Sequence, residues 1–171
     1  MPFMTTLNEI REHSPCTEGW TKLLGTLGKT KADDEPLSLL AILDSNGLDD
    51  ALWCARAFKG HDRDFRLFGV WAARQVQHLM TDQSSLNALD VAERHANDEA
   101  TDDELDAAWS AAWSAAGAAA GAAAGAAAGA AAMAAARAAA WAAAWAAQEN
   151  RLRQMIADGC WIGSTQPDQA Q

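Results

Sequence analysis

The sequence predicts an all-α protein, with an N-terminal bundle of short helices followed by a long helical element rich in alanine, tryptophan and glycine. Helix-capping signals recur through the first hundred residues, whereas no stretch shows the two-residue alternation of a strand. From residue 107 onward alanine dominates, and alanine has the highest helix propensity. These observations together favour helices packed on helices over any sheet-containing class.

Six short helices are expected between residues 5 and 96. The first begins at a capping box, in which Thr6 and Glu9 can each satisfy the backbone N–H of the other. The next three helices are indicated by three kinds of signal: proline in a first turn, glycine after a last turn, and acidic residues near a helix start. The expected signals are Ser14, Pro15 and Gly28 for the second helix, a polar linker over 29–35, Pro36 and Asn46–Gly47 for the third, and Asp49, Asp50 and Gly60 for the fourth.

The fifth helix, over 61–80, is the most amphipathic of the chain, and the sixth, over 84–96, repeats its pattern. The expected apolar positions of these two helices are Phe65, Phe68, Val70, Trp71, Val76, Leu79, Leu86, Leu89 and Val91, and the expected polar positions are Arg63, Arg66, Arg74, Gln75 and Gln77. Because Trp20, Trp53 and Trp71 lie in such apolar patterns, we expect them in the core.

A second capping box, Thr101 with Glu104, begins the long element, which extends from about 102 to 157. Between Trp109 and Trp145, most of the non-alanine residues recur at every fourth position: Trp109, Trp113, Gly117, Gly121, Gly125, Gly129, Met133, Arg137, Trp141 and Trp145. As one straight helix it would be roughly 80 Å long, far more than the radius of a compact domain of this size.

The tract is nearly mirror-symmetric about position 127, so an antiparallel hairpin would bring Trp109 to Trp145 and Trp113 to Trp141. We prefer this hairpin to a straight rod because four glycines weaken the middle of the helix. A membrane span from Trp113 to Trp141 is disfavoured, since alanine and glycine are barely apolar and Arg137 lies inside it. The expected division is a bundle over 1–100, the alanine-rich element over 101–157 and a flexible C-terminal tail over 158–171.

Charge excludes direct nucleic-acid binding, because a net charge of −10 leaves no basic stripe to neutralise phosphates. Twenty of the 23 acidic residues lie in 1–106, and six of them crowd into 98–106. A solvated helix start is the simpler interpretation of this cluster, and packing within the protein is the simpler interpretation of the last four tryptophans. Both sets are nonetheless the candidate partner-binding residues: Asp98, Glu99, Asp102, Asp103, Asp106, Trp109, Trp113, Trp141 and Trp145.

No residue pattern indicates catalysis, a cofactor or a metal. The four histidines, His13, His61, His78 and His95, are scattered, and His61 beside Asp62 and Asp64 is interpreted as a helix start. Cys16, Cys54 and Cys160 share no metal-binding spacing, and Cys54 is expected to be a buried structural thiol. The glycines of the tract follow no strand, so the phosphate-loop pattern fails. The first residues lack a secretion signal, so we expect a cytoplasmic, non-enzymatic protein.

The segments "LDDALWCARAF", "LFGVWAARQVQHLM" and "LDVAERHANDEATDDELDAAW", with the following tract, resemble alanine-rich bacteriophage and prophage proteins grouped with Imm5-like immunity proteins. The resemblance covers about residues 5–157, although glycine stands at four positions where those proteins have charged residues. It implies a small helical protein that binds and neutralises a protein partner, a toxin or a host defence component. A phage anti-defence inhibitor acting through the acidic face, as an anti-CRISPR-like protein or DNA mimic, is the alternative. A third interpretation is a membrane-associated alanine/glycine helix. Homodimerisation through that helix is also open.

Overall fold

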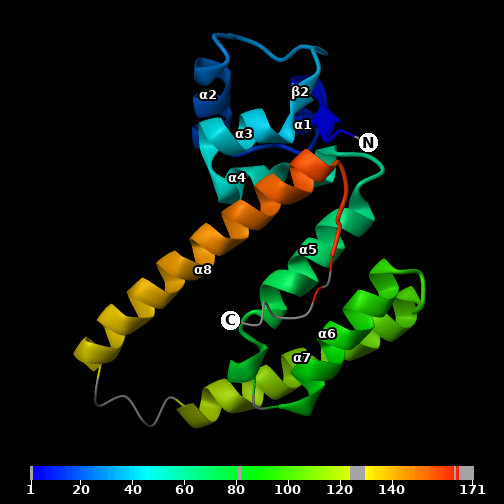
Figure 1. The fold of residues 1–171 in the computed structure, drawn as a ribbon, viewed down its shortest axis with the longest axis vertical. Coiled ribbons are helices and arrows are strands. Elements are labelled where there is room, and N and C mark those ends of the chain that lie inside the picture. Colours follow the sequence, from blue (N-terminus) through cyan, green and yellow to red (C-terminus); the bar gives the residue numbers. More distant parts are fainter. Residues whose placement is uncertain (1, 81, 124–129, 164, 166–171) are drawn as a thin grey trace. The chain divides into compact units, whose positions relative to one another are not determined.

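The computed structural model describes residues 2–80, 82–123, 130–163 and 165, and confirms the all-α class (Figure 1). The described chain forms α1 (Leu7–Glu12), α2 (Thr17–Thr26), α3 (Leu39–Asn46), α4 (Leu48–Trp53), α5 (Asp62–Arg74), α6 (Gln83–Ala96), α7 (Asp102–Ala123) and α8 (Ala130–Asp158), with the 3-10 helices η1 (Cys54–Ala57) and η2 (Gln77–Leu79) and the strands β1 (Met4–Thr5) and β2 (Leu37–Ser38).

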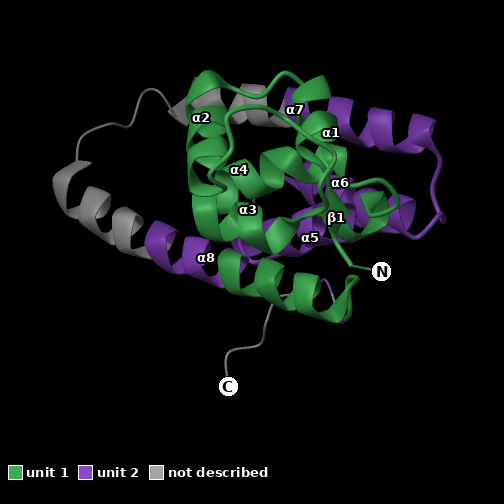
Figure 2. Cartoon of the chain, turned by 90° about the horizontal axis from the view of Figure 1, so that it is seen from above, with its two compact units in different colours: residues 1–65, 149–162 green, residues 66–148, 163–171 purple. Residues whose placement is uncertain are grey.

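The chain divides into two compact units that do not follow the expected boundary at residue 100 (Figure 2). Unit 1 comprises residues 1–65 and 149–162, and unit 2 comprises residues 66–148 and 163–171. Helices α5 and α8 each contribute residues to both units. Unit 1 is therefore discontinuous in sequence, since its last segment follows the main part of unit 2.

A short antiparallel strand pair, which the sequence did not predict, lies at the start of unit 1. Thr5 of β1 is opposite Leu37 of β2. Two residues per strand are too few to show an alternating pattern, so the pair leaves no signal in the sequence. The predicted capping box is confirmed directly after β1, because Thr6 Oγ1 accepts from the Glu9 N–H at 3.1 Å and the Thr6 N–H donates to Glu9 Oε2 at 3.1 Å.

The predicted start of the second helix was wrong. Ser14 does not cap it, since its φ of +57° places it in the left-handed region, and α2 begins three residues later. Cys16 is the N-cap residue instead, with its Sγ accepting from the Gly19 N–H at 3.4 Å. Helix α3 likewise begins at Leu39 rather than near Pro36, because the residues between them form β2.

The core of unit 1 combines residues from both ends of the chain. Its buried apolar side chains are Phe3, Leu7, Ile10, Leu23, Leu37, Leu39, Ile42, Leu43, Leu48, Ala51, Cys54, Ala57, Phe58, Leu152, Met155 and Trp161. Leu152 and Met155 come from α8, and Trp161 comes from the segment after it, where a flexible tail was expected from residue 158. Trp161 is buried there, and the Arg151 guanidinium lies 4.3 Å from the centre of its ring.

Among the side chains that the structure describes, unit 2 has a smaller apolar core than unit 1, with a charged residue buried within it. The buried apolar residues are Leu67, Phe68, Val70, Trp71, Val91, Ala96 and Ala108. Arg74, expected on the polar face, is buried because its guanidinium bonds Asp90 at 2.9 Å and Glu93 at 2.6 Å, both on α6. Val76, expected on the apolar face, is exposed because α5 ends at Arg74 and the helical face does not continue to it.

The alanine tract is described as two helices. Helix α7 ends at Ala123 and α8 begins at Ala130, so Gly117 and Gly121 lie within a helix. Gly125, Gly129 and the centre of the sequence mirror at position 127 lie outside the described residues. The turn of the expected hairpin therefore stays a prediction, whereas a close pairing of Trp113 with Trp141 disagrees with the exposure of both rings.

Candidate binding surfaces

One face of α7 presents two acids and two tryptophans in a row. Asp102, Asp106, Trp109 and Trp113 follow one another at spacings of four, three and four residues. At about 100° per residue, these spacings place all four within about 60° of arc. The Asp102 side chain is 94% exposed, and Trp109 and Trp113 are 60% and 76% exposed. We call these four residues the α7 face.

A side of α7 about 100° around the helix from this face packs on α6. Leu105 and Ala112 are partly buried there, and Ala108 is buried. Small residues let the two helices approach closely, but they leave nothing tall enough to cover an indole ring. The expectation that the last four tryptophans pack within the protein is thus wrong for Trp109 and Trp113.

The other two candidate tryptophans lie on α8. Trp141 is 72% exposed, so packing within the protein is wrong for it as well, whereas Trp145 is half-buried. A large apolar ring at such exposure leaves most of its surface in water, which burial by a partner would remove.

Part of the acidic cluster has a local structural role. The second capping box is confirmed: the Glu104 N–H donates to Thr101 Oγ1 at 3.2 Å, and the Thr101 N–H donates to Glu104 Oε2 at 2.8 Å. The Thr101 N–H and the Thr101 hydroxyl both donate to the Glu104 carboxylate, and these two bonds, aided by the charge of Arg94, hold the pKa of Glu104 below its ordinary value. Asp102 Oδ1 lies 2.7 Å from Nε2 of the largely buried His95.

The remaining acids of the cluster surround the start of α7. Asp98, Glu99, Asp103 and Asp106 are all exposed, and Asp98 has a φ of +59°, a conformation that Asp tolerates better than most residues. The sequence thus placed the acids correctly at a helix start, and the structure leaves these four carboxylates open to a partner.

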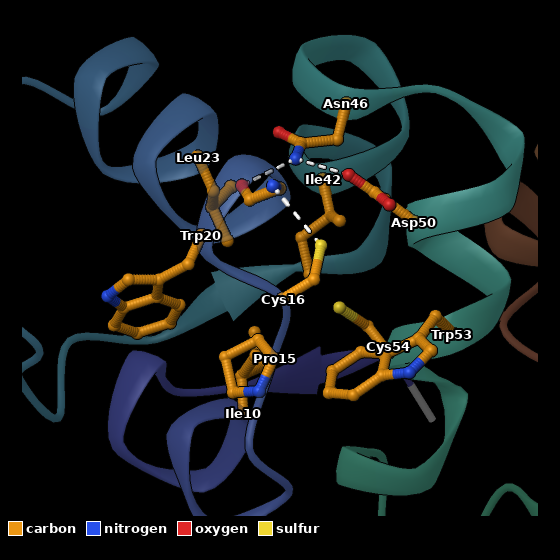
Figure 3. A pocket seen from close by; sticks show the side chains of 11 residues that line it. Ile10, Pro15, Cys16, Trp20, Leu23, Ile42, Asn46, Asp50, Trp53 and Cys54 are labelled. Atoms are coloured by element: carbon orange, nitrogen blue, oxygen red, sulfur yellow. Dashed lines mark hydrogen bonds between the residues drawn. The ribbon is translucent and has the colours of Figure 1, made fainter.

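Unit 1 contains a separate pocket that the sequence did not indicate, with a volume of about 100 Å³ (Figure 3). Trp20 and Trp53 lie on opposite sides of it, and neither is fully buried as expected. Each occurs at a helical apolar spacing, which is why both were interpreted as core. The rest of its lining is Ile10, Pro15, Cys16, Gly19, Leu23, Ile42, Asn46, Asp50 and Cys54.

The thiol of Cys54 borders this pocket but is itself buried, as the sequence predicted. Burial, followed by the negative charge of Asp50, raises the pKa of the thiol to about 12. A nucleophilic cysteine needs the opposite shift, so this environment suits a structural thiol.

His61 belongs to a buried polar cluster at the start of α5, where the sequence predicted only a helix start. Its Nδ1 lies 2.8 Å from Asp64 Oδ2, and the Phe3 ring stacks on its imidazole with ring centres 3.9 Å apart. The second oxygen of Asp64 accepts from the backbone N–H of Trp161 at 2.7 Å. Within the described residues, no three His, Cys, Asp or Glu side chains are grouped to hold a metal ion.

Among the described residues, no helix has the length and apolar character needed to cross a membrane. In comparisons with known proteins, no family model, no curated protein and no solved structure matches the chain. Its function is therefore inferred from its own surfaces.

Proposed function

We propose that the protein is a non-enzymatic binding module whose α7 face docks onto a protein partner. The observation that supports this most directly is the exposure of Trp109 and Trp113, one turn apart on a helix that packs on α6 through an adjacent side. Tryptophan is enriched at the positions that contribute most binding energy in protein interfaces.

The composition of the α7 face indicates what kind of surface the partner should present. Two adjacent indole rings fit an apolar groove, and the neighbouring Asp102 and Asp106 fit a basic rim at one end of that groove. Opposite charges of this kind accelerate association and fix the orientation of the two proteins. The resemblance noted in the sequence supports an immunity or antitoxin-like role in the cytoplasm, with a toxin or a host defence component as the partner.

A second candidate is an anti-defence inhibitor that acts through charge alone. The exposure of Asp98, Glu99, Asp103 and Asp106 favours it, because a surface that mimics nucleic acid needs carboxylates and no tryptophans. The two candidates differ in which side chains are essential, so one set of variants separates them.

The test is affinity capture from the native host, followed by measurement of the equilibrium constant with the purified partner. We expect the double variant Trp109→Ala, Trp113→Ala to weaken binding at least about thirtyfold, since one interface tryptophan typically contributes about 2 kcal/mol or more. Ala111→Gln, at an exposed position on the far side of α7, is the matched control and should bind normally. A partner that binds the double variant as tightly as the native protein would contradict docking on the α7 face.

The charge variant Glu99→Lys, Asp106→Lys leaves the capping box intact and retains Asp98, whose positive φ disfavours lysine. Under the proposed docking, the association rate at low salt should fall and become less salt-dependent, while dissociation changes little. Complete loss of binding by this variant, with the tryptophan variant unaffected, would favour the charge-only candidate instead.

A further inference from the structure

The pocket of unit 1 has a small volume and a mainly apolar lining. Its volume of about 100 Å³ is smaller than the cavity of about 150 Å³ that accommodates benzene. Its walls are mainly apolar, from Ile10, Leu23 and Ile42 to the two tryptophans. An unbranched chain of about four carbons matches this combination of volume and lining.

One end of the pocket holds a carboxylate in a fixed position. Asn46 Nδ2 donates to Asp50 Oδ2 at 2.7 Å and to the backbone oxygen of Gly19 at 2.9 Å, joining α3, α4 and α2 (Figure 3). A Cβ on Gly19 would lie only 2.8 Å from Asp50 Oδ2, so the carboxylate can take this position because residue 19 is glycine. Asp50 is half-buried, and its charge faces a site with apolar walls.

The indole rings of Trp20 and Trp53 add a second preference for positive charge. The face of an indole attracts cations, and Trp53 already holds the guanidinium of Arg56 at 4.4 Å from its ring centre. No lysine or arginine lines the pocket, so Asp50 is the charged residue among its lining residues and would repel an anion.

We propose that this pocket binds an alkylammonium group, with the aliphatic chain between Trp20 and Trp53 and the ammonium at Asp50. Because Asp50 is only half-buried, the ammonium retains part of its hydration while the chain is removed from water. The same chemistry occurs in a free small amine and in a lysine side chain of a polypeptide. The proposal is independent of the α7 face.

The test follows the indole N–H resonances of the ¹⁵N-labelled protein during titration with n-butylammonium, n-butanol and butyrate, which share one chain length. We expect n-butylammonium to shift the Trp20 and Trp53 signals and to bind at least about fivefold tighter than n-butanol, with butyrate weakest. The signal of the buried Trp71 should not move. Equal affinity for the amine and the alcohol, or no shift at Trp20 and Trp53, would overturn the proposal.

Asp50→Asn is the decisive variant, because asparagine retains an oxygen for the bond from Asn46 while removing the charge. It should bring the affinities for n-butylammonium and n-butanol to within about twofold of each other. Asp49→Asn, an exposed neighbour in the same turn, is the matched control and should keep the preference. If both variants lost the preference for n-butylammonium over n-butanol equally, the preference would come from general surface charge, and the proposed site would be wrong.

Two capped tripeptides, Gly-Lys-Gly and Gly-norleucine-Gly, distinguish a lysine side chain from a free small amine as the source of the alkylammonium group. The two peptides differ only in the ammonium. Binding of the lysine peptide alone, at the affinity of n-butylammonium or tighter, assigns a polypeptide ligand. Binding of n-butylammonium with neither peptide bound assigns a free amine. Equal binding of both peptides would contradict recognition of the ammonium.

Discussion

Replacing Asp64 by alanine should lower the free energy of unfolding by about 3 kcal/mol, because it leaves two buried donors unsatisfied at about 1–3 kcal/mol each. In the native protein its carboxylate bonds His61 Nδ1 at 2.8 Å and accepts from the Trp161 N–H at 2.7 Å. The His61 and Asp64 side chains are 6% and 11% exposed, so water cannot readily replace the lost acceptor.

Urea unfolding followed by circular dichroism measures this loss. The matched control is Asp62→Ala, an exposed acid in the same first turn, which should lose less than about 1 kcal/mol from the helix dipole. Asp64→Asn should fall between the two, since its amide oxygen can still accept one of the bonds. If Asp64→Ala and Asp62→Ala were equally stable, the cluster would not contribute to the stability of unit 1.

Cys54 should react with iodoacetamide at pH 8 about a thousandfold more slowly than a cysteine in a short peptide. The thiolate is the reactive form, and with the pKa of Cys54 raised to about 12 its thiolate fraction at pH 8 is about 10⁻⁴. Peptide mapping by mass spectrometry measures the rate at this one residue. Modification at the peptide rate under native conditions would show that Cys54 is not buried in solution.

The raised pKa of Cys54 also predicts that the folded protein loses stability at alkaline pH. A thiol in the unfolded chain loses its proton near pH 8.5, whereas the folded protein retains the Cys54 proton to about 12. The stabilisation is therefore complete below about pH 8.5 and is lost progressively as the pH rises toward 12. Cys54→Ala should remove this part of the pH dependence, and an unchanged alkaline profile in that variant would contradict the assignment.

Features whose partners lie within one turn could be predicted from the sequence. The two capping boxes are of this kind, since Thr6 and Thr101 each bond a glutamate three residues later. The strand pair could not be predicted, because β1 and β2 are separated by α1, α2 and a linker. The burial of Arg74 likewise depends on two carboxylates of α6, which no local pattern connects to it.

The candidate sites divide in the same way. The spacing of Asp102, Asp106, Trp109 and Trp113 is visible in the sequence once α7 is assumed, and only their exposure required the structure. The pocket had no such signal, because its lining comes from α1, α2, α3, α4, η1 and the residues just before α2. Trp20 and Trp53 resemble ordinary core residues until the fold places them on opposite sides of a cavity.

The discontinuity of unit 1 has a consequence for how the protein is made. After residue 65, the ribosome must add the 83 residues of 66–148 before the last segment of unit 1 begins, which takes roughly 4–17 s at about 5–20 residues per second. During that interval Leu152, Met155 and Trp161 do not yet exist, and Asp64 lacks a bonding partner that follows 97 positions later. In a nascent chain that stops before residue 149, unit 1 lacks part of its core. Chaperones and proteases can therefore bind this incomplete unit, whereas its core is closed in the finished protein.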